Sequence, residues 1–233
     1  TRKRSSAASD VYKRQPKGQW TFVDAFSGIG NASVGFELAG GVCVGAFEKC
    51  ANARRLFQRR TNVAPLGSWG SFKPSDLPKA DVLFSSPPCE AKHDKANEAR
   101  LMWRQLDLVR EHQYQVVVIE HLLHFKQLED GKVYHEFVAE LQRCGYVTFG
   151  KLLNAPDFGS AANRKRLYLV ALRQDVATRT GDFRFPRGSP VHHPVWSILE
   201  PEFFRKGVRV GNTNYVEFEE PVQHDDSCLR QLG

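Results

Sequence analysis

Four side chains in this sequence lie next to short apolar runs and could take part in chemistry. Cys89 follows a rigid Pro-Pro turn, and a thiol held there could act as a nucleophile. Glu120 ends a run of β-branched residues, and its carboxyl group could hold a substrate or move a proton. Arg164 and Arg166 precede another apolar run, and their guanidinium groups suit phosphates and base oxygens. Each also has a simpler explanation: a buried thiol, a structural ion pair of the glutamate with an arginine, and a solvated basic surface.

A glycine-rich turn supplies candidates for ligand binding. The stretch Asp24-Ala25-Phe26-Ser27-Gly28-Ile29-Gly30 lies between an apolar run and a helical pattern, so its backbone could approach a ligand closely. Ser33 stands where the dinucleotide-binding fingerprint has its third glycine, which makes the match to NAD binding poor. Glu48 follows the next apolar run, where a carboxylate commonly accepts hydrogen bonds from ribose hydroxyls. Together these features indicate a nucleoside-containing cofactor, and the alternative is a tight turn beside a solvated glutamate.

Alternating strand and helix patterns must position these side chains. Helical spacing predicts helices at residues 32–39, 50–60, 97–112 and 133–144, and apolar runs predict strands at residues 20–26, 42–47, 82–85, 116–119, 146–153 and 166–172. The pattern predicts an α/β, Rossmann-like fold with a mostly parallel central sheet and helices on both faces. Because ligands bind beyond the carboxyl ends of such strands, the candidates should converge on one crevice.

Two details of burial are also predicted. The unbroken β-branched run at residues 116–119 indicates a central strand buried on both faces. In the second helix, Ala53, Leu56 and Phe57 are expected on one inward face.

Composition and charge exclude several classes of protein. The 233 residues are 41% hydrophobic and 25% charged, which is ordinary for a globular protein, and no apolar run has membrane-spanning length or resembles a secretory signal. The formal net charge is +7, but residues 1–18 alone contribute +5, so the overall basicity is weak support for a nucleic-acid partner. Five cysteines without a C-x-x-C pair argue against a disulfide framework and a cysteine zinc site, which indicates an intracellular compartment.

The pattern divides the chain into three parts. Residues 1–18 form a disordered basic arm or a non-native extension, and residues 19–175 form a cofactor-binding catalytic domain. Residues 176–233 are irregular and are interpreted as the start of a truncated recognition or linker region.

Taken in order, the motifs resemble the cytosine-C5 DNA methyltransferase family from about Thr21 to about Leu199. The glycine turn, Pro-Pro-Cys, a glutamate ending Val-Val-Val-Ile-Glu and an Arg-x-Arg leading into a strand carry the resemblance. Residues 153–159 and 183–186 also fit the pattern.

The resemblance implies DNA (cytosine-5)-methyltransferase activity with S-adenosyl-L-methionine as cofactor. Cys89 would add to C6 of a flipped-out cytosine, and Glu120 would hydrogen-bond N3 and the exocyclic amine. Arg166 would hold the base oxygen, and Arg164 would support Glu120 or a phosphate. The cofactor-binding residues implied by the resemblance are Phe26, Ser27, Gly28, Ile29, Gly30, Glu48, Pro88 and Leu101.

The resemblance also implies a cellular setting. It predicts a monomer that acts on DNA in restriction–modification, without a metal or a membrane. The location would be the cytoplasm of a prokaryote or phage-infected cell, or the nucleus of a eukaryote.

Several positions depart from the family pattern. Ser68 stands where an acidic residue usually reads the adenine amine, Glu90 follows the cysteine in place of glutamine, and His121 and Ala162 replace an asparagine and a glutamine. Gly211-Asn212-Thr213 is the nearest string to the closing Gly-Asn motif, and a recognition domain of normal size is not expected. The chain is therefore expected to be a truncated or degenerate copy.

Three alternatives remain open. One is a catalytically weak or inactive module that only binds cofactor or a partner, and another is a tRNA cytosine-5 methyltransferase. The third is an amino-group methyltransferase, because Ser86-Pro87-Pro88 fits the turn of those enzymes, although Cys89 replaces their aromatic residue.

Overall fold

The computed structural model describes residues 19–88, 95–181 and 183–189, and side chains are described for all of these except residues 95–100. The described residues fall into two compact units. Residues 19–152 and 166–185 form the first, and residues 153–165 and 186–189 belong to the second. The predicted boundary at residue 175 stays a prediction.

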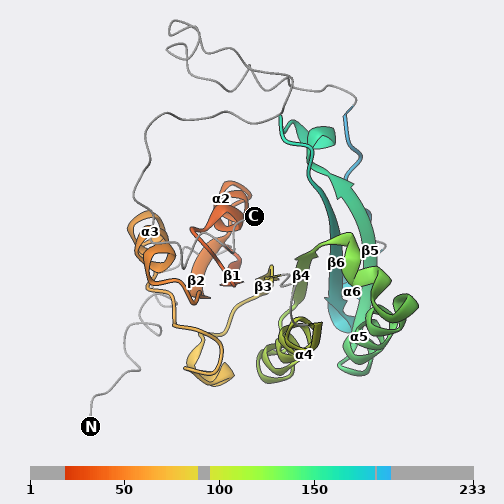
Figure 1. Ribbon diagram of the computed structural model, residues 1–233, viewed down its shortest axis with the longest axis horizontal. Coiled ribbons are helices and arrows are strands. Elements are labelled where there is room, and N and C mark those ends of the chain that lie inside the picture. Colours follow the sequence, from red (N-terminus) through yellow and green to blue (C-terminus); the bar gives the residue numbers. More distant parts are fainter. Residues whose placement is uncertain (1–18, 89–94, 182, 190–233) are drawn as a thin grey trace, which may run out of the picture. The chain divides into compact units, whose positions relative to one another are not determined.

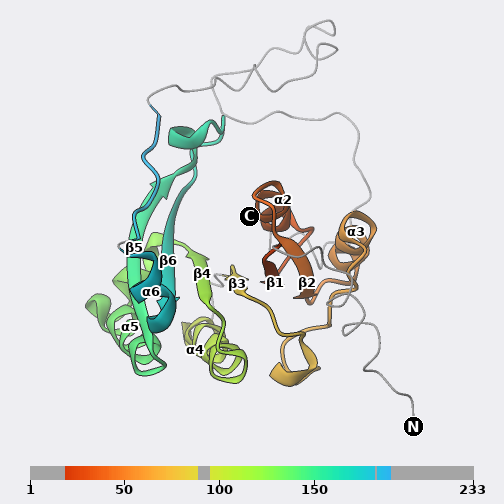
Figure 2. The same ribbon diagram turned by 180° about the vertical axis from the view of Figure 1, so that it is seen from behind.

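A six-stranded sheet with the order β2-β1-β3-β4-β6-β5 forms the centre of the first unit, and Figures 1 and 2 show it from opposite sides. β1 pairs in parallel with β2 and β3, and β3 pairs in parallel with β4, whereas β6 runs antiparallel to β4. The strands span Thr21–Ala25 (β1), Val42–Phe47 (β2), Val82–Ser85 (β3), Val116–His121 (β4), Tyr146–Asn154 (β5) and Lys165–Arg173 (β6). The α/β fold and the mostly parallel sheet are therefore confirmed, and the predicted strands at 42–47 and 82–85 have the observed bounds.

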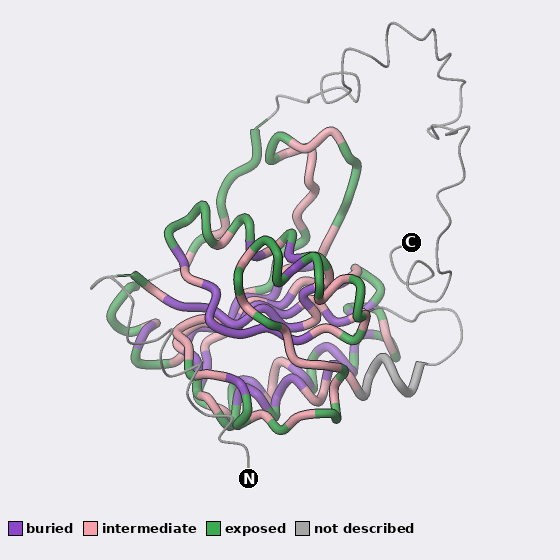
Figure 3. Tube along the Cα trace, turned by 90° about the vertical axis from the view of Figure 1, so that its left-hand side faces the viewer, coloured by how far each residue is buried: buried purple, intermediate pink, exposed green. Residues whose placement is uncertain are grey.

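Helices pack on both faces of this sheet. They span Asn31–Leu38 (α2), Ala51–Thr61 (α3), Lys95–His112 (α4), Lys132–Arg143 (α5) and Gln174–Thr180 (α6), with short 3-10 turns at Pro74–Asp76, Leu123–Gly131 and Ala155–Phe158. Phe57 of α3 packs with Phe22 of β1 in one cluster, whereas buried residues of α4 and α5 join Val23 in the other. Because neighbouring residues of a strand point to opposite faces, α3 and the α4–α5 pair cover different sides. Figure 3 shows that buried residues are concentrated along the strands.

Two details of burial differ from the sequence predictions. Leu56 is 51% exposed while Phe57 is fully buried, because the helix presents only a narrow apolar stripe to the sheet. β4 lies inside the sheet, but Val116, Val118 and Glu120 are only partly covered, while the alternate residues are buried. The face of β4 that carries Glu120 is therefore more open than its unbroken β-branched sequence suggested.

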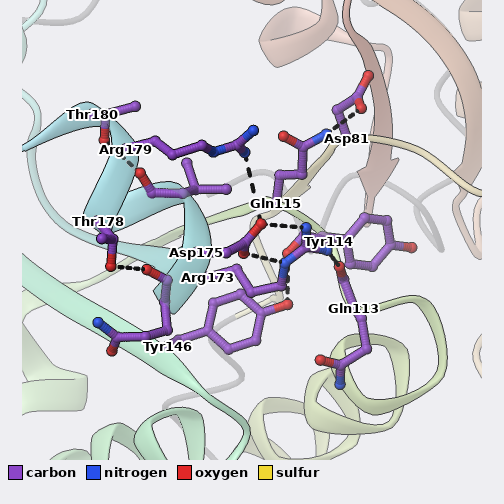
Figure 4. A network of polar contacts seen from close by, with 12 residues as sticks. Asp81, Gln113, Tyr114, Gln115, Tyr146, Arg173, Asp175, Thr178, Arg179 and Thr180 are labelled. Atoms are coloured by element: carbon purple, nitrogen blue, oxygen red, sulfur yellow. Dashed lines mark hydrogen bonds and ion pairs between the residues drawn. The ribbon is translucent and has the colours of Figure 1, made fainter.

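A polar network joins the strands at the edge opposite to the candidate site (Figure 4). Asp81, just before β3, accepts hydrogen bonds from the backbone nitrogen of Thr21 at 2.8 Å and from Nε2 of Gln115 at 2.7 Å. Arg173 donates to the carbonyl of Gln113 at 2.6 Å and forms an ion pair with Asp175. The hydrogen bonds and the charge of Arg173 hold the pKa of Asp175 at about 2. These contacts fix the strand starts relative to one another, which in turn sets where β1, β3 and β4 end.

Candidate functional site

The carboxyl ends of three parallel strands lie side by side. Ala25 of β1 is paired with Ser85 of β3, and Ser85 is paired with Ile119 of β4. The backbone nitrogen of Ser86 also donates to the carbonyl of Ala25 at 3.3 Å. The next residue on each strand therefore begins the glycine turn, begins the Pro-Pro turn, or is Glu120. Three segments that sequence reasoning grouped by chemistry thus emerge at one edge of the sheet.

The glycine turn has the backbone geometry that its sequence requires. Phe26, Gly28 and Gly30 have φ angles of 57°, 53° and 91°, and the nitrogen of Gly30 donates to the carbonyl of Ser27 at 2.8 Å. A Cβ on Gly28 would have no neighbouring atom within 4 Å, so the backbone there borders open space. A ligand could therefore approach this turn, which fits the cofactor implied by the resemblance.

Glu48 connects the glycine turn to the end of β2. Its Oε2 accepts a hydrogen bond from the nitrogen of Gly28 at 3.0 Å, and its Oε1 accepts one from the nitrogen of Cys50 at 2.7 Å. A carboxylate has about four lone-pair sites, so this half-buried side chain can still accept hydrogen bonds from a ligand. Sequence reasoning expected the ribose role and missed this structural one, because the bond to Gly28 spans 20 residues.

Aromatic side chains form an apolar wall beside this turn. The ring of Phe47, at the end of β2, lies 4.7 Å from Phe26, 5.4 Å from Trp69 and 5.0 Å from Phe72, measured between centroids. Sequence reasoning named neither Trp69 nor Phe72 as a candidate, and the signal was their clustering after the second helix. Ser68, which directly precedes Trp69 in the sequence, is exposed. Phe47 itself is buried, and the half-buried rings of Phe26, Trp69 and Phe72 provide an apolar surface of the kind that aromatic ligands favour.

Glu120 and Arg166 form an ion pair, with 2.9 Å between Nε and Oε1. The antiparallel ladder pairs Glu120 with Tyr168, so Arg166 lies two residues away on the same face. Both side chains are mostly covered, with 16% and 21% of their surfaces exposed. The alternative interpretation of Glu120 as a partner of an arginine is therefore confirmed.

The remaining predicted site residues lie on several segments of the chain. Arg164 belongs to the second unit, where its side chain is exposed and its carbonyl accepts a hydrogen bond from the nitrogen of Ala155 at 3.0 Å. Cys89 lies outside the described residues, one residue beyond the half-buried Pro88. Ile29 is 45% exposed, and Leu101 on α4 is half-buried.

His121, a departure from the family pattern, is a core residue. Its side chain is 2% exposed and its ring lies 5.0 Å from that of Phe125, measured between centroids. Burial lowers the pKa of His121 to about 4, with a smaller opposing effect from its hydrogen bond to the carbonyl of Leu122. The imidazole is therefore neutral at pH 7, and it points to the face of β4 opposite to Glu120.

Asp24 is a functional-site neighbour that sequence reasoning did not single out. It is 1% exposed within β1, and Ser33 of α2 donates a 2.5 Å hydrogen bond to its Oδ2. Burial raises the pKa of Asp24 to about 7, against a lowering effect of Ser33. Its Oδ1 has no hydrogen-bond partner among the described residues. The contact ties the helix after the glycine turn to the strand before it.

Further features of the described residues concern metal-ligating side chains, membrane-spanning helices and cysteines. No group of three or more metal-ligating side chains occurs in residues 19–88, 95–181 and 183–189. Within the same ranges, no helix has the length and apolar character to cross a membrane. Among the described cysteines, Cys43 and Cys144 are free thiols.

Comparison with known proteins gives a consistent assignment. The family model for C-5 cytosine-specific DNA methylases matches residues 20–230. The Type II methyltransferase M.BsuFI from Bacillus subtilis is 26% identical over 209 residues, covering 86% of this chain and 51% of that protein. The Type II methyltransferase M.HhaI from Haemophilus parahaemolyticus is 25% identical over 219 residues, covering 91% of this chain and 66% of that protein. The chain thus spans one half to two thirds of the length of these relatives.

A solved structure supports the fold. The crystal structure of a mutant DNMT2 from Spodoptera frugiperda has a TM-score of 0.62 and 21% sequence identity, and the match covers 78% of this chain and 60% of that one.

Proposed function

Because this chain belongs to the C-5 cytosine-specific DNA methylase family, we propose that it transfers a methyl group from S-adenosyl-L-methionine to C5 of cytosine in DNA. The observation that carries the proposal is the strand register, which brings the glycine turn, the Pro-Pro turn and the Glu120–Arg166 pair to neighbouring strand ends. Cys89 is only four residues beyond Ser85 in the sequence, so its thiol is within chain reach of the same edge.

In this proposal, Cys89 begins the reaction. Its thiolate adds to C6 of the cytosine, which makes C5 electron-rich enough to take a methyl group. Glu120 holds the N3 edge of the base, and Arg166 fixes the orientation of Glu120 while its other N–H groups face the base oxygen. Transfer of the C5 proton to solvent then re-forms the C5–C6 double bond and expels the sulfur from C6, which releases Cys89 as a thiolate.

The glycine turn, Glu48 and the aromatic wall would hold the cofactor. When bound, S-adenosyl-L-methionine supplies the methyl group as an electrophile. The backbone of residues 26–30 offers close approach, and Glu48 offers acceptor sites to ribose hydroxyls. The half-buried rings of Phe26, Trp69 and Phe72 would offer an apolar surface to the adenine, since Ser68 has no carboxylate to contact the adenine amine. Pro88 and Leu101 complete the pocket in this proposal.

The cellular role is part of the same proposal. The curated relatives are type II methyltransferases from bacteria, which supports DNA modification in the cytoplasm of a bacterium or a phage-infected cell. Arg164 is assigned to support of Glu120 or to a DNA phosphate.

Methyl transfer can be tested with the full chain, labelled S-adenosyl-L-methionine and a cytosine-containing duplex. The parent should label the duplex, Cys89→Ser should not, and Cys144→Ser should behave like the parent because it removes a half-buried thiol elsewhere. A duplex with 5-fluorocytosine should trap a covalent complex only when residue 89 is cysteine, because fluorine cannot leave C5 as the proton does. Transfer by Cys89→Ser at the parental rate would contradict the proposed nucleophile.

The same experiment separates the remaining alternatives. Cofactor binding by calorimetry without any transfer would support the binding-only module. Label appearing in a structured RNA but not in the duplex would support the RNA alternative.

A further inference from the structure

The positive charge of this chain outside its first 18 residues is concentrated in one segment. Residues 49–75 contain six basic residues and no acidic residue, whereas the rest of residues 19–233 holds 21 basic and 25 acidic residues. The six are Lys49, Arg54, Arg55, Arg59, Arg60 and Lys73. A segment this one-sided creates a local positive potential that the overall charge of the chain conceals.

Most of this charge lies on α3, which follows the edge strand β2 (Figure 1). Phe57 anchors the inner side of α3 in the core and is fully buried. Arg55 and Arg59 are one turn apart on the exposed surface, about 6 Å along the helix axis. Asn52 and Asn62 extend the same row by about one turn at each end. This row is thus polar and cationic, and α3 contains no acidic residue.

Some arginines of this segment have hydrogen-bond or ion-pair partners within the protein, but the two arginines of the exposed row have no acidic partner among the described residues. Arg54 donates to the carbonyls of Glu48 and Lys49 at 2.8 and 2.7 Å, and Arg60 pairs with Glu37 at 3.1 Å. Arg55 contacts only the neutral Asn52, and Arg59 has no hydrogen bond or ion pair within the described residues. Arg59 lies in the last turn of α3, where its positive charge interacts favourably with the helix dipole, and this explains its position. The helix dipole does not explain the position of Arg55, which lies outside the last turn.

We propose that the exposed row of α3, centred on Arg55 and Arg59, binds the phosphate backbone of duplex DNA outside the catalytic crevice. The inference rests on the proposed function for the choice of DNA over other polyanions. Duplex DNA carries about one negative charge per 1.7 Å of axis, so two guanidinium groups about one turn apart can meet phosphates in many registers. Arginine pairs phosphate oxygens with two parallel N–H groups, and side-chain amides such as those of Asn52 and Asn62 also bind phosphates. The contact reads no sequence and increases the time that the protein stays on DNA.

The test measures DNA binding, so it does not depend on catalysis. Arg55→Gln/Arg59→Gln is compared with Lys132→Gln/Arg143→Gln, which removes two exposed positive charges from α5 instead. Every protein also carries Cys89→Ser, and each is titrated against a labelled cytosine-free duplex over a range of salt concentrations. A duplex without cytosine isolates the backbone contact from recognition of the target base.

Loss of two phosphate contacts should reduce the magnitude of the slope of log K against log salt by about 1.8, because each contact contributes about 0.9. The α5 variant should keep the parental slope, and circular dichroism should show parental helix content in both variants. Equal slopes for the parent and the α3 variant would overturn the proposal, as would the same decrease in both variants. Tighter binding of an acidic peptide than of the duplex through these arginines would also overturn it. If the methyl-transfer test failed while the α3 slope changed as expected, the DNA contact would stand without the proposed chemistry.

Discussion

Replacing Asp24 by asparagine should change how the stability of this protein depends on pH. Burial raises the pKa of Asp24 from 3.8 to about 7, so the folded chain keeps a proton that the unfolded chain releases. The stabilising contribution of Asp24 is therefore complete below about pH 3.8 and is lost as the pH rises through about 7. His121 acts in the opposite direction, since its pKa is lowered from 6.5 to about 4. Its contribution is present above about pH 6.5 and is lost as the pH falls through about 4.

The magnitudes follow from these two pKa shifts. A group protonated in only one of the two states changes the free energy of unfolding by about 1.4 kcal/mol per pH unit. Between about pH 4 and 6.5 the slopes from Asp24 and His121 nearly cancel in the parent protein. Asparagine does not titrate, and its Oδ1 can still accept the hydrogen bond from Ser33. The free energy of unfolding of Asp24→Asn, minus that of the parent, should therefore increase by about 4 kcal/mol between about pH 4 and pH 7.5.

Urea unfolding followed by tryptophan fluorescence at several pH values in this range measures that difference, since the chain has four tryptophans. Asp107→Asn is a suitable control, because the Asp107 side chain is 52% exposed and its removal should leave the pH dependence unchanged. Ser33→Ala should shift the loss of stability to higher pH, because the Ser33 hydrogen bond lowers the pKa of Asp24. A constant difference between Asp24→Asn and the parent at all pH values would refute the buried, proton-holding carboxyl group.

Three further substitutions test the site itself. Glu48→Ala removes the acceptor of the Gly28 hydrogen bond, so cofactor affinity measured by calorimetry should fall about 10- to 100-fold, with an unchanged affinity contradicting the assigned role. Arg166→Ala removes the ion-pair partner that Glu120 has in the sheet, so labelled-methyl transfer should fall at least about 100-fold. Thermal unfolding should show that the variant is folded, and parental activity would exclude the pair from catalysis. Gly30→Ala places a Cβ 2.7 Å from a buried phenylalanine ring at a φ of 91°, which should cost about 1–3 kcal/mol in urea unfolding, whereas parental stability would show that the turn can relax.

Strand positions were predictable because glycine and proline residues mark where the strands begin or end. Gly40-Gly41 separates α2 from β2, and Ser86-Pro87-Pro88 ends β3, so both strands have the predicted limits. The glycine turn follows β1 as predicted, because the apolar run before it is short and unambiguous. Glu120 was predicted to end its strand, but β4 continues by one residue to His121.

Contacts between distant segments were not predictable from the same signals. The bond of Glu48 to the nitrogen of Gly28 depends on the pairing of β1 with β2, which no residue type specifies. The contact of Asp24 with Ser33 depends on how α2 crosses β1. The sequence alone therefore showed Asp24 only as one residue of the glycine-turn motif and did not reveal that its carboxyl group is buried. His121 stood in the sequence as a departure near the site, but strand alternation directs it into the core.

The reversed direction of β6 makes the site sensitive to insertions in a particular way. Arg166 reaches Glu120 through a ladder register, so one residue added between Arg166 and Tyr168 would turn the guanidinium to the other face of the sheet. Residues added ahead of Lys165 would only lengthen the connection from β5, and the ladder would be kept. Natural variation in chain length should therefore be frequent before this strand and rare within its first three positions.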